Sequence, residues 1–327
     1  MKAVVITKNK ELRWSEVPDP IMIAGEVLVE IHAAGVNRAD IMQKSGSYPP
    51  PPDCPDWPGL EVSGVIKNIS DEAKSESKWK IGDKVCALLG GGGYAEYAAV
   101  HHTMLMPVPD GVSMTEAAAL PEAFAAAYLN LFMEGGGKAG DTLLMHAGAS
   151  GLASVVIPLA KAFGMRVITS VMSAEIAEKI GHLQADIVID TSTQDVAKVL
   201  KQENELGRPV TIVIDCLGGE KTGECFDHVA HGCRWIMIAA LAGELTSVNL
   251  RTLYMKNIRL IGSTLRSKPR HIKAEILARL VGDVWRKVSS GEVRPTIFKT
   301  FPIEKAEDVH KLLEDGKSIG KVVLLVK

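Results

Sequence analysis

The sequence predicts an α/β protein of two domains, one mostly β and one built on a doubly wound parallel sheet. Its 327 residues exceed the usual size of a single hydrophobic core. Short strand-like segments separated by glycine and proline occupy residues 1–120. From residue 121 to 265, apolar strands alternate with amphipathic helices. We therefore expect one domain at 1–120 and 266–327, and a second at 121–265.

The first domain is expected to be a partly open barrel, because its strands are short and separated by tight turns. Examples of the expected strands are residues 2–7, 26–33, 60–69, 84–89 and 94–100. The segment 71–80 is charged and polar, and we expect it to be a solvated loop.

The second domain is expected to alternate strand and helix in chain order. Expected strands are residues 142–146, 166–171, 187–190, 210–216, 234–239 and 258–263, with helices at 123–133, 151–163, 174–182 and 193–202. Two further helices (271–289 and 304–314) and a closing strand (321–326) are expected to return to the first domain.

Composition excludes several classes of partner and location. A formal net charge of -2 gives no reason to expect nucleic acid or an anionic membrane as a partner. The N-terminal apolar run is too short for a signal peptide, and no apolar stretch reaches the ~20 residues of a membrane helix. Five scattered cysteines favour reduced thiols in a cytoplasm over a disulfide framework.

The strongest chemical signal is a turn of small residues between the strand at 142–146 and the helix that follows. Gly148, Ser150, Gly151, Leu152 and Ala153 are predicted to bind a dinucleotide there. Small residues allow the tight turn, the approach of the backbone to a pyrophosphate and the packing of helix on strand, while the helix N-terminus offers free N–H groups. The alternative is an ordinary strand-to-helix turn, since any such turn favours small residues.

The next strand suggests which dinucleotide is bound. An NAD site places an acid about 20 residues beyond the first glycine, where it holds the ribose 2′-hydroxyl. Here that strand carries Thr169 and Ser170 and ends without a carboxylate. Because nothing there repels a 2′-phosphate, we expect NADP(H), with Thr169 and Ser170 among the cofactor-binding residues.

Ten further segments, in chain order, identify a family. They are residues 35–40, 46–49, 58–64, 82–85, 91–97, 118–122, 215–219, 234–235, 265–267 and 319–324. Through them the chain resembles zeta-crystallin-like quinone oxidoreductases of the medium-chain dehydrogenase/reductase superfamily over essentially its whole length. The resemblance implies a Rossmann-type sheet plus a GroES-like catalytic domain, Leu217 at the cofactor, and a homodimer formed through an edge of the nucleotide-domain sheet.

The resemblance also implies that no metal is bound. Where alcohol dehydrogenases of the superfamily hold catalytic zinc with cysteine and histidine, this chain has Asn37 and Leu60. No closely spaced cysteines are present for a structural zinc, and Cys54 with His32 is better explained by packing. Without a Lewis acid, an acceptor that already delocalises the incoming charge is favoured over an alcohol.

Tyr48 and Asn37 resemble the family's polar residues at the substrate, and we predict that they are catalytic. Tyr48 would orient the acceptor oxygen or donate a proton, and Asn37 would position substrate or nicotinamide between the domains. Each has a simpler alternative. Tyr48 precedes four prolines and could serve as a loop anchor, Asn37 could cap a helix beginning at Arg38, and Asp40 is expected to be structural.

Departures from the family put cofactor affinity in question. Ala126 stands where the family usually has threonine near the nicotinamide, and Ala153 where it has glycine. The Gly-Ser and lysine that grip the 2′-phosphate appear here as 171–172 (Val-Met) and 174–175 (Ala-Glu). Arg266 is predicted to compensate by contacting phosphate, with a surface salt bridge as the alternative.

The sequence thus favours an NADPH-dependent, metal-free enzyme that reduces quinones or related conjugated carbonyls by two electrons. Reduction of the carbon–carbon double bond of an enal, enone or enoyl thioester uses the same hydride geometry and remains an alternative. A third possibility is a catalytically weak family member that acts as a binding protein. The sequence does not identify the natural acceptor.

Overall fold

The computed structural model describes residues 1–316 and 318–327, which divide into two compact units. Unit 1 comprises Met1–Ala125, Arg266–Gly291 and Pro295–Lys327. Unit 2 comprises Ala126–Leu265 and Glu292–Arg294. Within the described residues, no helix is both long enough and apolar enough to cross a membrane.

Unit 1 is mostly β. Its strands are β1 (Lys2–Ile6), β2 (Leu12–Glu16), β3 (Glu26–Val36), β4 (Glu61–Ile69), β5 (Lys84–Leu88), β6 (Tyr97–His101), β7 (Leu105–Pro107), β14 (Ile297–Pro302) and β15 (Lys321–Leu325). Its helices are α1 (Arg38–Ser45), α2 (Asp71–Glu76), η1 (His102–Met104), α3 (Met114–Ala117), the first part of α4 (Pro121–Tyr128), α10 (Arg270–Ser289), η5 (Ile303–Lys305) and α11 (Ala306–Glu314).

The long strand β3 organises unit 1. Among the described residues, β1 and β2 form one small sheet, and a larger sheet has the order β14-β15-β3-β4-β5-β7. One edge of β3 pairs with β6 along residues 26–30 and with β15 along residues 33–36, while its other edge pairs with β4. No pairing between β14 and β7 closes the sheet in the described part of the chain. The pairing of β15 with β3 places the last strand of the chain in the sheet of unit 1.

Unit 2 is a layered α/β structure. Its strands are β8 (Thr142–Met145), β9 (Arg166–Val171), β10 (Ile187–Asp190), β11 (Ile212–Asp215), β12 (Arg234–Met237) and β13 (Arg259–Gly262). Its helices are the end of α4, η2 (Leu129–Glu134, a π-helix), α5 (Ala153–Ala162), α6 (Ala174–Lys179), η3 (Gly181–Leu183), α7 (Val196–Glu205), α8 (Thr222–Cys225), η4 (Phe226–His228) and α9 (Leu250–Met255).

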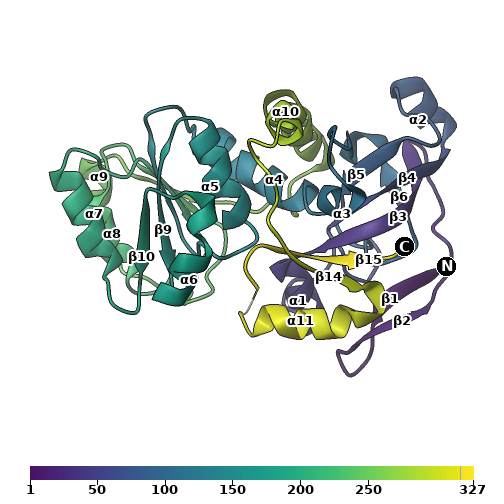
Figure 1. Ribbon diagram of the computed structural model, residues 1–327, viewed down its shortest axis with the longest axis horizontal. Coiled ribbons are helices and arrows are strands. Elements are labelled where there is room, and N and C mark those ends of the chain that lie inside the picture. Colours follow the sequence, from purple (N-terminus) through teal and green to yellow (C-terminus); the bar gives the residue numbers. More distant parts are fainter. Residues whose placement is uncertain (317) are drawn as a thin grey trace. The chain divides into compact units, whose positions relative to one another are not determined.

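All pairings in the sheet of unit 2 are parallel, in the order β10-β9-β8-β11-β12-β13. The chain starts at β8, moves outward to β10, and then returns to β11 on the other side of β8. Helices therefore cover both faces, with α5 and α6 on one face and α7, α8 and α9 on the other (Figure 1). Trp235 and Phe226 anchor the core beneath the second group. The predicted doubly wound parallel sheet is confirmed.

Two local features differ from expectation. Residues 71–76 form α2 instead of a solvated loop, because the Ser70 hydroxyl accepts from the Ala73 N–H and acidic residues occupy the first turn. The buried methyl of Ala73 then fixes this short helix to the unit. Strand β14 was not expected, since it is paired on one side only and its sequence, Ile-Phe-Lys-Thr-Phe-Pro, does not alternate apolar with polar residues.

Candidate functional site

The predicted turn in unit 2 is shaped by close contact with the neighbouring strand. Ala147 has a positive φ of 56°, so a left-handed residue that is not glycine makes the tight turn. Gly148 follows, and a Cβ atom on it would lie 2.5 Å from the Thr169 Oγ1. The Gly148 N–H donates to the Ser170 carbonyl at 2.8 Å. Glycine is therefore required where the turn crosses β9.

Beyond Gly148 the chain enters α5 with two backbone donors unused. The Ser150 Oγ accepts from the Ala153 N–H at 3.1 Å, and Ala153 is fully buried. The N–H groups of Gly151 and Leu152 have no acceptor anywhere in residues 1–316 and 318–327. Unpaired N–H groups at the start of a ten-residue helix, together with the positive end of its dipole, fit a phosphate group.

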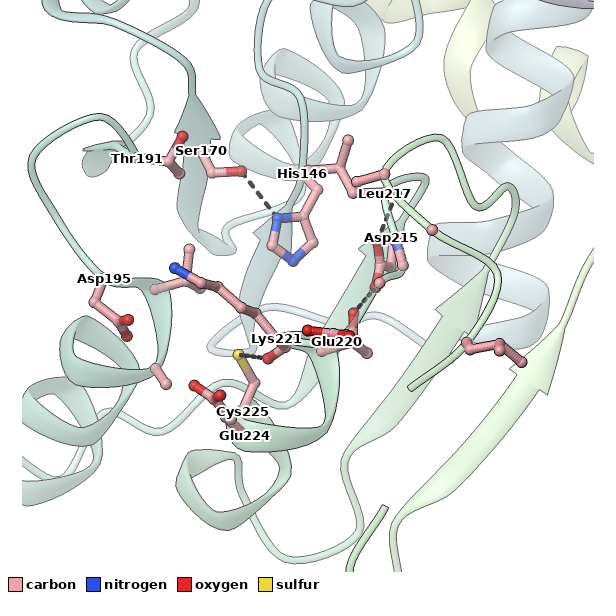
Figure 2. Close-up of a pocket in the computed structure, with 18 of the residues that line it drawn as sticks. His146, Ser170, Thr191, Asp195, Asp215, Leu217, Glu220, Lys221, Glu224 and Cys225 are labelled. Atoms are coloured by element: carbon pink, nitrogen blue, oxygen red, sulfur yellow. Dashed lines mark hydrogen bonds between the residues drawn. The ribbon is translucent and has the colours of Figure 1, made fainter. Parts of the chain in front are cut away.

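A cavity of about 830 Å³ lies at the carboxyl ends of the strands of unit 2 (Figure 2). Its wall includes His146 after β8, Ser170 in β9, Thr191 after β10, and Asp215 and Leu217 at the end of β11. The strand order reverses between β8 and β11, and nucleotides bind at such a point in doubly wound sheets. The turn residues 148–153 do not line this cavity themselves, but Gly148 is bonded to Ser170, which does.

Asp215 and His146 were not singled out from the sequence. The Asp215 carboxylate accepts from the N–H groups of Leu217 and Gly218, at 2.8 and 3.0 Å, and from the Trp235 indole at 3.1 Å. It fixes the loop that carries Leu217. The His146 Nδ1 lies 2.9 Å from the Ser170 Oγ. Burial lowers the pKa of His146, and the negative charge of Asp215 acts in the opposite direction. Thr169, in contrast, is fully buried and donates its hydroxyl to the Met145 carbonyl.

In unit 1, Asn37 is held by a buried ion pair. Its Nδ2 donates to the Glu61 Oε1 at 3.0 Å, and the Lys321 ammonium donates to its Oδ1 at 2.6 Å. Lys321 also pairs with the Glu61 carboxylate, and both side chains are almost fully buried. Asn37 is the N-cap residue of α1, but the carboxylate of Asp40 satisfies its backbone N–H. The amide of Asn37 is thus fixed in place by charge.

Tyr48 and Arg266 lie against each other in unit 1. The Arg266 guanidinium carbon is 5.0 Å from the centre of the Tyr48 ring, and Nη1 donates to the Tyr48 carbonyl at 3.2 Å. The remaining guanidinium nitrogens donate to the Gly90 carbonyl and the Gln43 Oε1, at 2.8 and 2.6 Å. Arg266 is therefore buried with acceptors from unit 1, and it forms no surface salt bridge with any residue that the structure describes.

The Tyr48 hydroxyl has no hydrogen-bond partner among the described residues, unlike the guanidinium beneath its ring. Burial raises the pKa of Tyr48, and the charge of Arg266 opposes that rise. The hydroxyl is therefore protonated at neutral pH and is able to donate. Tyr48 lies in a loop next to four prolines, which agrees with the alternative that it is a loop anchor. Its hydroxyl nevertheless remains available to donate to a substrate.

Asp40 lies in a fully buried network. Its carboxylate accepts from the N–H groups of Asn37 and Gly59, at 2.8 and 3.0 Å, and from the Tyr94 hydroxyl at 3.0 Å. Desolvation raises the pKa of Asp40 to about 6 despite these donors. The network joins α1 to the loop around Gly59, which agrees with a structural role for Asp40. Leu60 is buried, and no group of three or more potential metal ligands is found in the part of the chain that the structure describes.

Comparison with known proteins places this geometry in context. Residues 23–110 match the model of the alcohol dehydrogenase GroES-like domain, and residues 183–324 match the model described as zinc-binding dehydrogenase. A quinone oxidoreductase-like protein 2 homolog of Nematostella vectensis is 30% identical over 308 residues, which cover 92% of this chain and 82% of the relative. The quinone oxidoreductase of Mus musculus is 27% identical, with 95% and 92% covered.

Solved structures give the same result. A mycobacterial protein complexed with NADPH superposes with a TM-score of 0.86 at 27% identity, covering 99% of each chain. A quinone oxidoreductase from Thermus thermophilus, also solved with NADPH, superposes with a TM-score of 0.83 at 28% identity over the full length of both chains. The cofactor expected from the sequence is the one found in these neighbours.

Proposed function

The chain belongs to the quinone oxidoreductase family of the medium-chain dehydrogenase/reductase superfamily, and on that premise we propose that it reduces quinones or related conjugated carbonyls with NADPH. The observation that supports this most directly is the pair of unpaired N–H groups of Gly151 and Leu152 at the start of α5. Together with Ser170 and Leu217 in the wall of the adjacent cavity, they fit a dinucleotide.

The bound cofactor supplies a hydride, which carries both electrons to the acceptor. The acceptor oxygen then needs a proton, and the Tyr48 hydroxyl is the donor because it is protonated and unpaired. Asn37 contributes an amide held rigidly by Glu61 and Lys321. We assign Arg266 to holding Tyr48, in place of the phosphate contact expected from the sequence. Thr169 acts indirectly, because its side chain packs against Gly148 and does not contact the cofactor.

We also propose that unit 1 binds the acceptor and unit 2 the dinucleotide, which corresponds to domains at 1–120 with 266–327 and at 121–265. The reaction as proposed needs no metal, because a quinone delocalises the incoming charge itself.

The proposal is tested by following NADPH absorbance with a panel of ortho- and para-quinones, and with an enal, an enone and an enoyl thioester. Turnover of quinones is expected. Turnover of the double-bond substrates alone would replace the quinone assignment with double-bond reduction. Folded protein that binds NADPH and reduces no acceptor would favour a binding protein.

Tyr48→Phe is expected to lower kcat by roughly 10²-fold, the lower range for loss of a general acid, and to leave the affinity for NADPH nearly unchanged. The exposed Tyr254 of α9 provides the matched control, and Tyr254→Phe is expected to leave kcat unchanged. Loss of NADPH affinity without loss of kcat would make Tyr48 a cofactor anchor instead.

We also propose a cellular compartment and an oligomeric state. All five cysteines are free, which supports a reducing compartment such as the cytoplasm. β13 is an edge strand with Leu260 49% exposed, which supports a homodimer formed through that edge. Cell fractionation tests the first. Light scattering on the purified protein tests the second, with a monomeric mass as the contrary result.

A further inference from the structure

The cavity of unit 2 holds a buried polar side chain with an unused atom. His146 is 7% exposed, and its Nδ1 is engaged with the Ser170 hydroxyl. Its Nε2 has no hydrogen-bond partner among the described residues, and Figure 2 shows the ring directed into the pocket. In the tautomer in which the Ser170 hydroxyl donates to Nδ1, Nε2 carries the proton and faces the cavity as a donor. Because His146 lines the cavity, a ligand bound there can accept a hydrogen bond from this atom.

The strand that would normally carry the phosphate clamp offers no free cation among the described residues. After β9, Met172 is exposed and apolar, and the Ser173 hydroxyl caps α6 by accepting from the Ile176 N–H. Glu175 forms an ion pair with Lys179 at 2.5 Å. Recognition of a 2′-phosphate therefore needs a positive charge from another element.

Lys221 supplies such a charge. It lies in the loop between β11 and α8 and belongs to the cavity wall with Thr191, Ser170 and His146. In Figure 2 its side chain extends from that loop into the pocket. Its ammonium forms no ion pair or hydrogen bond with any residue that the structure describes.

The same wall also carries carboxylates, whose charge must be weighed against Lys221. Asp215 is satisfied by two backbone N–H groups and the Trp235 indole, and Asp195 accepts from the Lys198 N–H at the start of α7. These donors offset both negative charges. Glu220, Glu224 and Glu244 also line the cavity and are exposed, so solvent and salt screen them.

We propose that Lys221, with the paired side chains of His146 and Ser170, recognises the 2′-phosphate of the adenosine ribose and so determines preference for NADP(H) over NAD(H). This inference rests on the proposed function. It places the ammonium and the His146 Nε2–H as donors to the phosphate oxygens, while the Thr191 hydroxyl is already used in donating to the Val171 carbonyl at 3.0 Å. Ser170 occupies the strand end where an acid would bind the ribose of NAD, so nothing on β9 repels the phosphate.

The test compares binding of 2′,5′-ADP and 5′-AMP by calorimetry, because the two differ only in the 2′-phosphate. The unmodified protein is expected to prefer 2′,5′-ADP. Lys221→Met is expected to weaken 2′,5′-ADP about tenfold and to change 5′-AMP less than about twofold, whereas Lys221→Arg retains the preference. Lys198→Met, an exposed lysine of α7 outside the cavity wall, is the matched control and should change neither affinity.

Two results would overturn the assignment of Lys221. One is an unmodified protein without preference for 2′,5′-ADP, and the other is a preference that survives in Lys221→Met. His146→Phe retains a ring beside Trp235 and is expected to weaken 2′,5′-ADP about fivefold more than 5′-AMP. Equal weakening of both ligands would remove His146 from the phosphate site.

Failure of this inference is distinguishable from failure of the proposed function. A Lys221-dependent preference in a protein that reduces no acceptor would support the inference and reject the reductase. The opposite result is a protein that reduces quinones equally well with NADPH and NADH and does not distinguish 2′,5′-ADP from 5′-AMP. That result would support the reductase and reject the inference.

Discussion

The polar groups of the two units differ in how many of them already have partners. In unit 1, Asn37, Glu61, Lys321 and Arg266 are bonded to one another or to nearby backbone, and the Tyr48 hydroxyl is left without a partner among the described residues. In unit 2, the donors of Gly151, Leu152, His146 and Lys221 likewise lack partners within the described chain.

This difference separates two uses of buried polarity. A satisfied network fixes side chains in one arrangement before any ligand arrives, and breaking it costs folding free energy. Unsatisfied donors contribute little to folding and are matched when a ligand binds. Substitutions in the network of unit 1 should therefore act mainly on stability, and substitutions in the cavity of unit 2 mainly on nucleotide affinity.

The largest effect is expected for Lys321→Met. Removing the ammonium leaves the fully buried Glu61 carboxylate without its counter-charge, which should cost about 3–5 kcal/mol of unfolding free energy. Chemical denaturation measures this loss, while calorimetry should find the affinity for 2′,5′-ADP nearly unchanged.

Lys74→Met provides the control for that substitution. Lys74 pairs with Asp71 on the surface at 3.0 Å, and such exposed pairs contribute about 0–1 kcal/mol. Exchange of Glu61→Gln together with Lys321→Met should recover part of the lost stability, because no unpaired charge is then buried. If Lys321→Met instead weakened nucleotide binding at constant stability, the contrast between the units would be lost.

A smaller effect, dependent on pH, is expected for Glu122 in unit 1. Burial, followed by the nearby charge of Glu61, raises the pKa of Glu122 to about 8. The folded protein therefore holds a proton that the unfolded chain releases near its ordinary pKa of 4.5. Stability should fall as pH rises from about 4.5 to about 8, and then level off.

Glu122→Gln removes this dependence. Its stability relative to the unmodified protein should increase between about pH 5 and pH 8, by on the order of a few kcal/mol. Thermal melting at each pH measures the difference, and Glu178→Gln on the exposed surface of α6 is the control. A difference between Glu122→Gln and the unmodified protein that stays constant with pH would show that folding leaves the pKa of Glu122 unchanged.

Strands were easier to predict than the contacts of the site. β9 and β10 match their expected bounds because each is a short segment in which valine and isoleucine are concentrated. The turn at Gly148 was found because crowding by the Thr169 side chain of β9 demands a small residue, and that small residue is visible in the sequence. α2 was missed because its cap, Ser70, lies in a segment whose charge suggested a loop.

The partners of the site residues could not be predicted, because tertiary structure alone brings them together. Glu61 and Lys321 are 260 positions apart and meet only through the pairing of β15 with β3 and of β3 with β4. Lys221 reaches the cavity because β11 lies beside β8, far from the strand where the sequence suggested a phosphate clamp. A histidine before the turn, such as His146, resembles a core residue until the cavity beside it is known.

The smallest of these effects on stability is expected for Gly148→Ala. This substitution tests, in unit 2, whether the turn that carries the unpaired N–H groups serves nucleotide binding. An added Cβ would lie 2.5 Å from the Thr169 Oγ1 and 3.0 Å from the Ile180 Cδ1, so the turn or β9 must shift. We expect a loss of about 1–3 kcal/mol in unfolding free energy. Because the same shift displaces the N–H groups of Gly151 and Leu152, affinity for NADPH should fall as well.

Thr169→Ala removes the nearest atoms and should restore part of both losses in the double variant. Gly181→Ala has no atom within 4 Å of its added Cβ and should change neither quantity. A Gly148→Ala variant with reduced stability and unaltered NADPH affinity would show that the turn packs the strand without holding the cofactor.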